Sequence, residues 1–397
     1  MKELDNFQEI KTICIECVSP VNIADGVKLN PKEYLFDRKN GMVYFLNQLS
    51  WHKFIYSKKL LSSYEKYMTD FREKRSLFEW LSDSGYGIED VKFAIKSSTT
   101  VVLNQLYFQE KKTLNEIITQ ERLSTGEIYL PGSSIKGVIR TAILYALLQK
   151  NPRVKEKYWR DVYKVTNDRY LKPNQVKAEL GKIAKNLEAE LLHKLNLLDE
   201  QGRGLKGNNA VCSVMRGISC SDANAANDIA TAVLQKVDCT YDKKTGKPKE
   251  SRLPIFRECV LPNNKFYCSL KIEKSITSVI GINSIDDLLE MLEGFFAFTK
   301  NIFGNAFARD FSNAFHNISE ANAYIGSNTG FLTKTVIAAL APSEREAVAA
   351  IKSWLNVAFR DHNHIIMDKH ISPRTLKTTY YNGKQYIMGL VKVYKNE

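Results

Sequence analysis

The chain has 397 residues, of which 44% are hydrophobic and 25% charged, a composition typical of a folded globular protein and not of a fibrous or disordered one. It contains 57 Lys and Arg against 44 Asp and Glu, and the net charge of +13 favours a polyanionic partner such as RNA. The lysines are spread along the whole chain, which argues against a membrane-binding basic helix. Because no apolar run could span a bilayer and the N-terminus does not resemble a signal peptide, we expect a cytoplasmic protein with reduced cysteines.

The first quarter of the chain predicts strands followed by helices. Residues 11–18 are β-prone and stop at Ser19-Pro20, which indicates an opening strand. A loop with Asn22 and Asp25 follows, and two short strands are expected to flank the turn at 38–41. Residues 47–82 have helical character, whereas residues 91–120 favour neither structure.

The segment Pro131-Gly-Ser-Ser-Ile-Lys-Gly-Val-Ile-Arg140 predicts a turn that runs into a helix. Pro131 and Gly132 favour the turn, and Ser133 or Ser134 can cap the helix. An apolar stripe at helical spacing predicts the buried face, made of Ile135, Val138, Ile139, Ala142 and Ala146.

This helix start has the chemistry of an anion site. It presents backbone N–H groups and the positive end of the helix dipole. Lys136 and Arg140 lie four residues apart and project from one face, and Gly137 between them allows close approach of a ligand. The alternative is a capped surface helix with two solvated cations, and composition weights the two interpretations about evenly.

The middle of the chain predicts a basic insertion and a β-hairpin. Residues 150–208 carry 14 Lys or Arg against 8 Asp or Glu with patchy apolar periodicity, so we expect a helical insertion outside the main core. Residues 229–241 and 251–260 bracket a turn and predict a projecting hairpin. The predicted hairpin contacts are its lysines, Lys243, Lys244, Lys247 and Lys249.

The last third predicts a strand at 265–273, helices that begin at the capping boxes of Ser284 and Ser343, and a final strand at 386–394. Gly326-Ser-Asn-Thr-Gly330, followed by Lys334, resembles the helix start in its small residues and nearby cation, with a flexible loop as the alternative. Arg374 and Lys377 form a third basic segment, with a solvated turn as the alternative.

Several patterns do not support an enzyme. Gly202-Arg-Gly-Leu-Lys-Gly207 matches a dinucleotide-binding string, but it follows a polar helical stretch and not a strand. The segment 361–370 contains three histidines and two aspartates without a known metal-ligand spacing. We therefore expect no catalytic residue, no metal and no cofactor.

The segment at 131–140 is similar to the signature Pro-Gly-Ser-Ser-Leu-Lys-Gly-x-x-Arg of CRISPR RAMP proteins. Further segments resemble that family in the same order, namely 19–26, 218–222, 256–266 and 325–331. Ser-Pro-Arg-Thr-Leu-Lys at 372–377 and Met-Gly-Leu-Val-Lys-Val at 388–393 resemble the fifth subunits of type III-A (Csm) complexes. These segments run from about residue 13 to residue 393, over most of the chain.

The resemblance implies an α+β fold with a ferredoxin-like (RRM-like) RAMP core, large helical insertions and a projecting β-hairpin. The core is expected at 1–30, 126–149, 209–228 and 262–340. The additions are expected at 31–125 (insertion with helix), 150–208 (basic helices), 229–261 (thumb-like hairpin) and 341–397 (C-terminal helix and strand extension).

The resemblance also implies a role. The partners would be crRNA, the backbone RAMP subunits of the Csm complex, and host nucleases as further candidates. The subunit would cap one end of the backbone filament, bind the 3′ region of the crRNA and contribute to its maturation or protection. The expected RNA-binding residues are Asn22, Gly132, Ser133, Ser134, Lys136, Gly137, Arg140, Gly326, Ser327, Asn328, Gly330, Lys334, Arg374 and Lys377.

Two rival interpretations remain open. One is a RAMP endoribonuclease that trims the crRNA precursor with His362, His364 or Asp25, although no tight acid–base constellation is visible in the sequence. Backbone RAMP subunits cut RNA with an aspartate after the first strand, but the short loop around Asp25 does not match that pattern. The other rival is a different RAMP subunit, against which the C-terminal motif argues.

Overall fold

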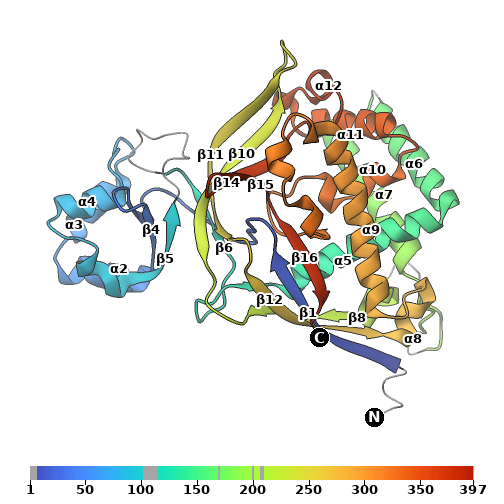
Figure 1. Cartoon of the computed structure of the whole chain (residues 1–397), viewed down its shortest axis with the longest axis horizontal. Coiled ribbons are helices and arrows are strands. Elements are labelled where there is room, and N and C mark those ends of the chain that lie inside the picture. Colours follow the sequence, from blue (N-terminus) through green and yellow to red (C-terminus); the bar gives the residue numbers. More distant parts are fainter. Residues whose placement is uncertain (1–6, 102–113, 169, 199–200, 206–209, 397) are drawn as a thin grey trace.

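The structure is a computed structural model that describes residues 7–101, 114–168, 170–198, 201–205 and 210–396. It is a mixed α+β protein with two curled sheets (Figure 1). In the described residues no helix is long and apolar enough to cross a membrane.

The first sheet, sheet A, holds the main core. Its strand order is β13-β16-β1-β12-β9-β7, and β8 also pairs with β12. The predicted opening strand is confirmed as β1, and the predicted strand at 265–273 as β12. The bounds are β1 Gln8–Cys17, β7 Tyr129–Leu130, β8 Ile218–Cys220, β9 Ala223–Ala225, β12 Lys265–Glu273, β13 Ala323–Tyr324 and β16 Leu390–Lys395.

Two long helices, α5 (Gly132–Lys150) and α9 (Ile285–Phe303), bury their apolar sides against one face of sheet A. Strand alternation directs Ile13, Ile15 and Cys17 into this core. Ser284 caps α9 in a capping box with Asp287, as predicted. These helices fix the position of the loops at both ends of the sheet.

The second sheet, sheet B, contains the predicted hairpin. Its order is β2-β6-β11-β10-β5-β4-β3, and β14 joins β10 and β15. The hairpin of β10 and β11 projects from the body (Figure 1) and has a bulge between Gln235 and Val237. The bounds are β2 Ala24–Leu29, β3 Tyr34–Asp37, β4 Met42–Leu46, β5 Ile95–Val101, β6 Ile117–Gln120, β10 Thr231–Tyr241, β11 Pro248–Val260, β14 Leu376–Tyr381 and β15 Lys384–Ile387.

The helices predicted at 47–82 form a separate lobe with β3, β4 and β5, at the left of Figure 1. They are α2 (Gln48–Ser57), α3 (Leu61–Thr69) and α4 (Leu77–Asp83). The aromatic side chains of Trp51, Tyr64 and Trp80 pack against one another, with ring centroids 5.3–6.4 Å apart. The lobe therefore has its own core, and β5 links it to the body by pairing with β10.

Two expectations about the additions were wrong. The basic helices α6 (Pro152–Asn167) and α7 (Pro173–Leu192) do not lie outside the main core, because side chains such as Trp159 and Leu191 join it. The last strand, β16, is not part of an extension, since it pairs with β1 inside sheet A. Neither placement follows from local sequence, because both depend on contacts between distant segments.

The helix predicted from Ser343 is confirmed as α11 (Glu344–Ala358), and α10 (Ile337–Leu340) and α12 (His364–Met367) complete this region.

Candidate RNA-backbone interface

The glycine-bearing loop at 326–330 is fastened to the loop that follows β1. The side-chain amide of Asn22 donates to the backbone carbonyl O of Glu258 (2.8 Å). The backbone carbonyl O of Asn22 accepts from the N–H of Ser327 (2.6 Å). The hydroxyl of Ser327 donates to the side chain of Asn22. Gly326 has a φ of +90°, and a methyl group there would overlap the carbonyl O of Asn22. Asn22 and Gly326 therefore hold the loop in place.

The rest of this loop also has internal partners. Asn328, at a φ of 61°, donates its amide to the sulfur of Met388 (2.8 Å). Gly330 has a φ of +98°. Gly389 packs against the loop so closely that a Cβ would lie 2.5 Å from the carbonyl O of Ile325. The loop is thus a platform held by internal hydrogen bonds and close packing.

This platform lies against the hairpin beside two cations. The Nε of Arg257 on β11 donates to the hydroxyl of Ser327 (3.2 Å). The Nη1 of Arg257 is buried and has no hydrogen-bond partner among the described residues. Burial lowers the pKa of Arg257 and of Lys334, and the charge of Arg257 lowers the pKa of Lys334 further. Each effect disfavours the charged forms, and a bound anion would offset it.

Two lysines extend this charge along the same face of the sheet. The cross-strand pairs Leu234–Arg257 and Asp238–Lys377 place their side chains, with Lys236, on one face. The carboxylate of Asp238 lies 3.1 Å from the Nζ of Lys236 and 3.2 Å from that of Lys377. Burial and the charge of Lys377 lower the pKa of Lys236 to about 8.

We call Lys236, Arg257, Lys334 and Lys377 the basic cluster. Asp238 is the acidic partner that Lys236 and Lys377 share, and its charge also acts on Arg257. Four cations against one carboxylate leave a net positive charge, and the side chains of Lys236 and Lys377 are only 13% and 22% exposed. Sequence reasoning included Lys334 and Lys377 but missed Lys236 and Arg257.

The start of α5 differs from this arrangement. The N–H of Gly132 donates to the carboxylate of Asp222 (2.7 Å), and a Cβ there would lie 2.5 Å from the carbonyl O of Cys220. The expected cap by Ser133 or Ser134 was wrong, because Pro131 is the N-cap and no side chain caps the helix. Ser133 is exposed and Ser134 half-buried within the first turn. The first backbone N–H of this helix is thus already hydrogen-bonded to a carboxylate of the protein.

The cations of α5 remain at the surface. Burial lowers the pKa of Lys136, which is half-buried. Arg140 lies 3.5 Å from Glu188 on α7. No atom comes within 4 Å of a Cβ built on Gly137, so the packing of the described residues does not require a glycine there. Gly137 leaves space that a partner from outside can use.

The cations of the third basic segment, Arg374 and Lys377, are paired with carboxylates of the same protein. Arg374 pairs with the buried Asp368 (3.0 Å), which also accepts hydrogen bonds from Ser372 (2.6 Å) and bonds with the ring of His364 (2.9 Å). His364 is therefore occupied in a buried network, while His362 is exposed. Asp25, the other residue of the nuclease alternative, accepts from the hydroxyl of Thr119 (2.7 Å). In the described residues no three His, Cys, Asp or Glu side chains could hold a metal ion.

The hairpin tip exposes Lys243, Lys244, Lys247 and Lys249. Asp242 stiffens the turn, because its carboxylate accepts from the N–H groups of Lys244 (3.0 Å) and Thr245 (2.9 Å). The hydrogen bonds from Thr245 and Lys244 lower the pKa of Asp242. The lysines are thus presented on a defined turn.

Comparison with known proteins gives consistent results. The sequence profile of the RAMP superfamily matches residues 14–305. The chain is 24% identical over 390 residues to the CRISPR system Cms protein Csm5 of Mycobacterium tuberculosis, covering 95% of both chains. It is 24% identical over 324 residues to the protein of the same name from Streptococcus thermophilus, covering 80% of this chain and 78% of that one.

Two solved structures share its fold. One is a chain of a Csm–crRNA–target RNA ternary complex of a type III-A CRISPR-Cas system, with a TM-score of 0.59, 16% identity, and coverage of 97% of this chain and 100% of that one. The other is the crystal structure of T. onnurineus Csm5, with a TM-score of 0.56, 15% identity, and coverage of 96% and 99%.

Proposed function

Because the chain belongs to the RAMP superfamily, we propose that it acts as the Csm5-type subunit of a type III-A CRISPR ribonucleoprotein and binds crRNA in its 3′ region. The Csm5 proteins of M. tuberculosis and T. onnurineus match 95% and 96% of this chain, additions included. The resemblance noted in the C-terminal motif leads to the same subunit. Its partners would be crRNA and the backbone RAMP subunits.

The order of the core strands supports a ferredoxin-like core. The chain runs from β1 through α5 to β8 and β12, and then through α9 to β16. In sheet A the strands lie in the order β16-β1-β12-β8, and all neighbours are antiparallel. This is the fourth-first-third-second order of a βαββαβ unit, the arrangement expected of an RRM-like RAMP core.

The basic cluster is the observation that carries the proposed RNA binding. Cations that lie half-buried with one carboxylate destabilise one another unless an anion binds between them. Phosphate is such an anion, and the guanidinium of Arg257 and the ammonium groups of the lysines are donors suited to it. Because Lys, Arg and backbone N–H groups bind phosphates and not base edges, binding is expected to be largely independent of base sequence.

The proposed position is the end of the filament. A subunit that polymerises needs one face to receive a neighbour and another to offer the next. The lobe of α2–α4 and the helices α6, α7 and α11 enlarge this chain on two sides of the RAMP core (Figure 1). These additions would block one of the two faces, so the subunit would be present once.

We further propose that the subunit is not itself a nuclease, and that it contributes to crRNA maturation by protecting the RNA end or by recruiting host nucleases. His364 and Asp25 are already engaged by Asp368 and Thr119. Cleavage of crRNA precursor by the purified protein, lost in an Asp25→Ala or His364→Ala variant, would instead establish the nuclease alternative.

The test is reconstitution of the complex with its crRNA, followed by native mass spectrometry. One copy of this subunit per particle, and loss of crRNA 3′-end protection when the subunit is omitted, are the expected results. Several copies per particle, or a filament of this subunit alone, would contradict the capping role.

A further inference from the structure

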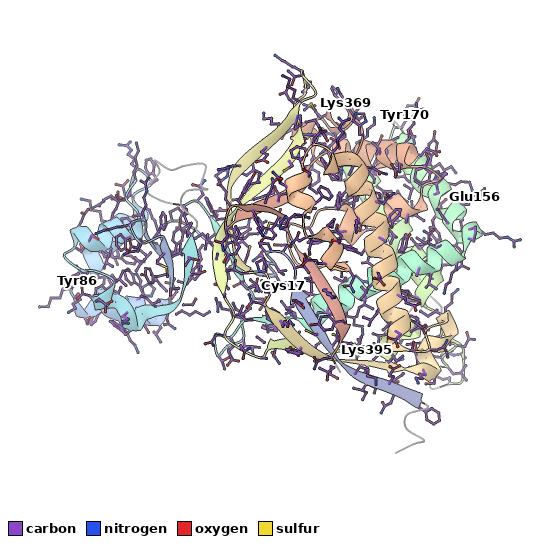
Figure 2. All side chains as sticks on the ribbon, in the orientation of Figure 1. Cys17, Tyr86, Glu156, Tyr170, Lys369 and Lys395 are labelled. Atoms are coloured by element: carbon purple, nitrogen blue, oxygen red, sulfur yellow. The ribbon has the colours of Figure 1, made fainter. Side chains whose placement is uncertain are left out.

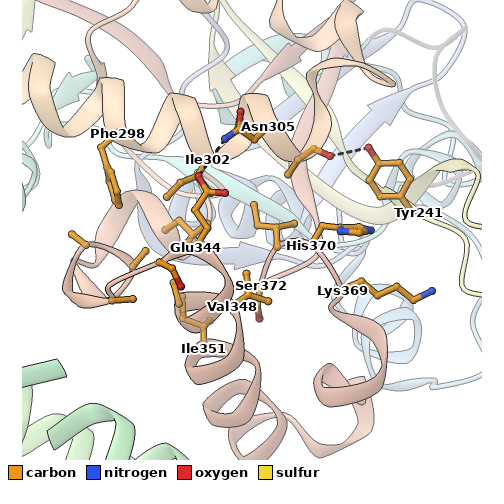
Figure 3. A pocket seen from close by; sticks show the side chains of 18 of the residues that line it. Tyr241, Phe298, Ile302, Asn305, Glu344, Val348, Ile351, Lys369, His370 and Ser372 are labelled. Atoms are coloured by element: carbon orange, nitrogen blue, oxygen red, sulfur yellow. Dashed lines mark hydrogen bonds between the residues drawn. The ribbon is translucent and has the colours of Figure 1, made fainter. Parts of the chain in front are cut away.

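A groove lies beneath the hairpin, away from the basic cluster and the start of α5. It has a volume of about 850 Å³ and lies between the hairpin tip, the end of α9, the start of α11 and the segment 366–372 (Figure 3). This volume falls within the range of binding pockets. Neither the proposed RNA contacts nor the filament faces account for it.

The floor of the groove is apolar and incompletely covered. Phe298 and Ile302 from α9 and Val348 from α11 point into it and are only half-buried. Ile366, also in its lining, is 63% exposed. Burying apolar surface of this kind is favourable by about 25 cal/mol per Å², so the floor favours an apolar occupant.

The rim of the groove carries a small net positive charge, because four Lys or Arg line it against three Asp or Glu. Lys155, Lys243 and Lys369 line it and have no acidic partner among the described residues. Lys369 lies beside the hairpin tip (Figure 2). The lining carboxylates have partners within the protein: Asp310 pairs with Arg309 (3.3 Å) and accepts from Tyr241 (3.0 Å), Glu344 accepts from Asn305 (3.2 Å), and Asp242 accepts from its own turn.

The groove is also preformed. The hydroxyl of Tyr241 donates to the carbonyl O of Ala306 (2.8 Å), which lies in a π-helical turn at Gly304–Ala308. The ring of Tyr241 stacks on Phe307 at an interplanar angle of 5°. These contacts fasten the hairpin to the end of α9, so an occupant would not have to order the walls.

We propose that this groove binds a segment of another protein that combines apolar side chains with carboxylates. The apolar floor would accept the hydrophobic side chains, and the three rim lysines would face the carboxylates. RNA fits less well, because a sugar–phosphate backbone would gain nothing from the apolar floor. The proposal does not depend on crRNA binding, since Lys243 is the one groove residue that also belongs to the predicted RNA and hairpin contacts.

The test uses the full-length protein and two fluorescent peptides of about 14 residues. One combines Leu and Phe with Glu, and the other carries Lys in place of Glu. The expected result is saturable binding of the Glu peptide alone. Val348→Glu should weaken this binding about tenfold, corresponding to about 1.4 kcal/mol, whereas Ala349→Glu, on the outer side of the same helix, should leave it unchanged.

A second pair of variants tests the rim. Lys243→Glu combined with Lys369→Glu should weaken binding of the Glu peptide, while Lys244→Glu, at the hairpin tip but outside the groove lining, should not. Three outcomes would overturn the proposal: no saturable binding, equal binding of both peptides, or insensitivity to Val348→Glu. Displacement of the peptide by a short single-stranded RNA would assign the groove to nucleic acid instead.

Discussion

The glycine-bearing loop and the start of α5 look alike in sequence but differ in the structure. Both have small residues followed by a cation. At the loop, the chain packs against the hairpin and gathers the four cations of the basic cluster, three of which interact with Asp238. At α5, Asp222 occupies the first amide and Glu188 pairs with Arg140. The difference leads us to expect that charges left without compensation, and not a glycine motif itself, mark the stronger anion site.

The glycines of the two regions also differ. Gly132, Gly326 and Gly389 are required by the protein, because a side chain at each would overlap a backbone carbonyl. Gly137 has open space around it. A glycine inside a helix costs about 1 kcal/mol relative to alanine, so its presence there suggests a partner that approaches closely.

The largest predicted effect concerns these glycines. Gly326→Ala should lower the free energy of unfolding by about 2–4 kcal/mol, because it adds a clash at a positive φ. Gly137→Ala should leave stability unchanged or raise it by up to about 1 kcal/mol. Urea unfolding of both variants measures the difference, and equal effects would break the distinction between the two glycines.

Asp238→Asn should change stability and RNA affinity in opposite directions. Lys236 and Lys377 would lose their shared carboxylate, so stability should fall by about 1–3 kcal/mol. The cluster would become more positive, so affinity for crRNA should rise. Asp286→Asn, which removes the exposed partner of Lys395, is the control and should change neither by much. A loss of affinity in Asp238→Asn would contradict a phosphate site.

The stability and the RNA affinity should both change with pH through Lys236, whose pKa is about 8 in the fold against 10.5 for an ordinary lysine. The unfolded chain binds more protons between these values, so the destabilisation present below pH 8 should be relieved as the pH rises towards 10.5. RNA affinity should fall over the same range as Lys236 loses its charge. Lys236→Met should remove both dependences in unfolding and binding titrations, and their persistence would assign them to another group.

The smallest effect is expected at α5. Arg140→Ala should cost at most about 1 kcal/mol of stability, because exposed ion pairs contribute little. Lys136→Ala with Arg140→Ala should weaken RNA binding and flatten its salt dependence modestly. An effect larger than that of removing Lys236 and Arg257 would reverse the ranking of the two regions.

Local patterns in the sequence predicted the strands β1 and β12, the hairpin and the capped helices, because alternation, turns and caps depend on neighbouring residues. They did not predict the place of β16 in sheet A or the packing of α6 and α7, which depend on pairing between distant segments. Lys236 and Arg257 were missed for the same reason. A cation within a strand is expected to face solvent, and the sequence does not show that a distant loop packs against it.

The salt dependence of crRNA binding tests the central claim most directly. The variant Lys236→Met, Arg257→Gln, Lys334→Met should be compared with the wild type and with a control of equal charge that lacks Lys53, Lys66 and Lys150, three exposed lysines. Loss of three phosphate contacts should reduce the slope of log affinity against log salt by about 2 for single-stranded RNA. A folded cluster variant whose affinity and slope equal those of the control would contradict the assignment of the basic cluster to the RNA backbone.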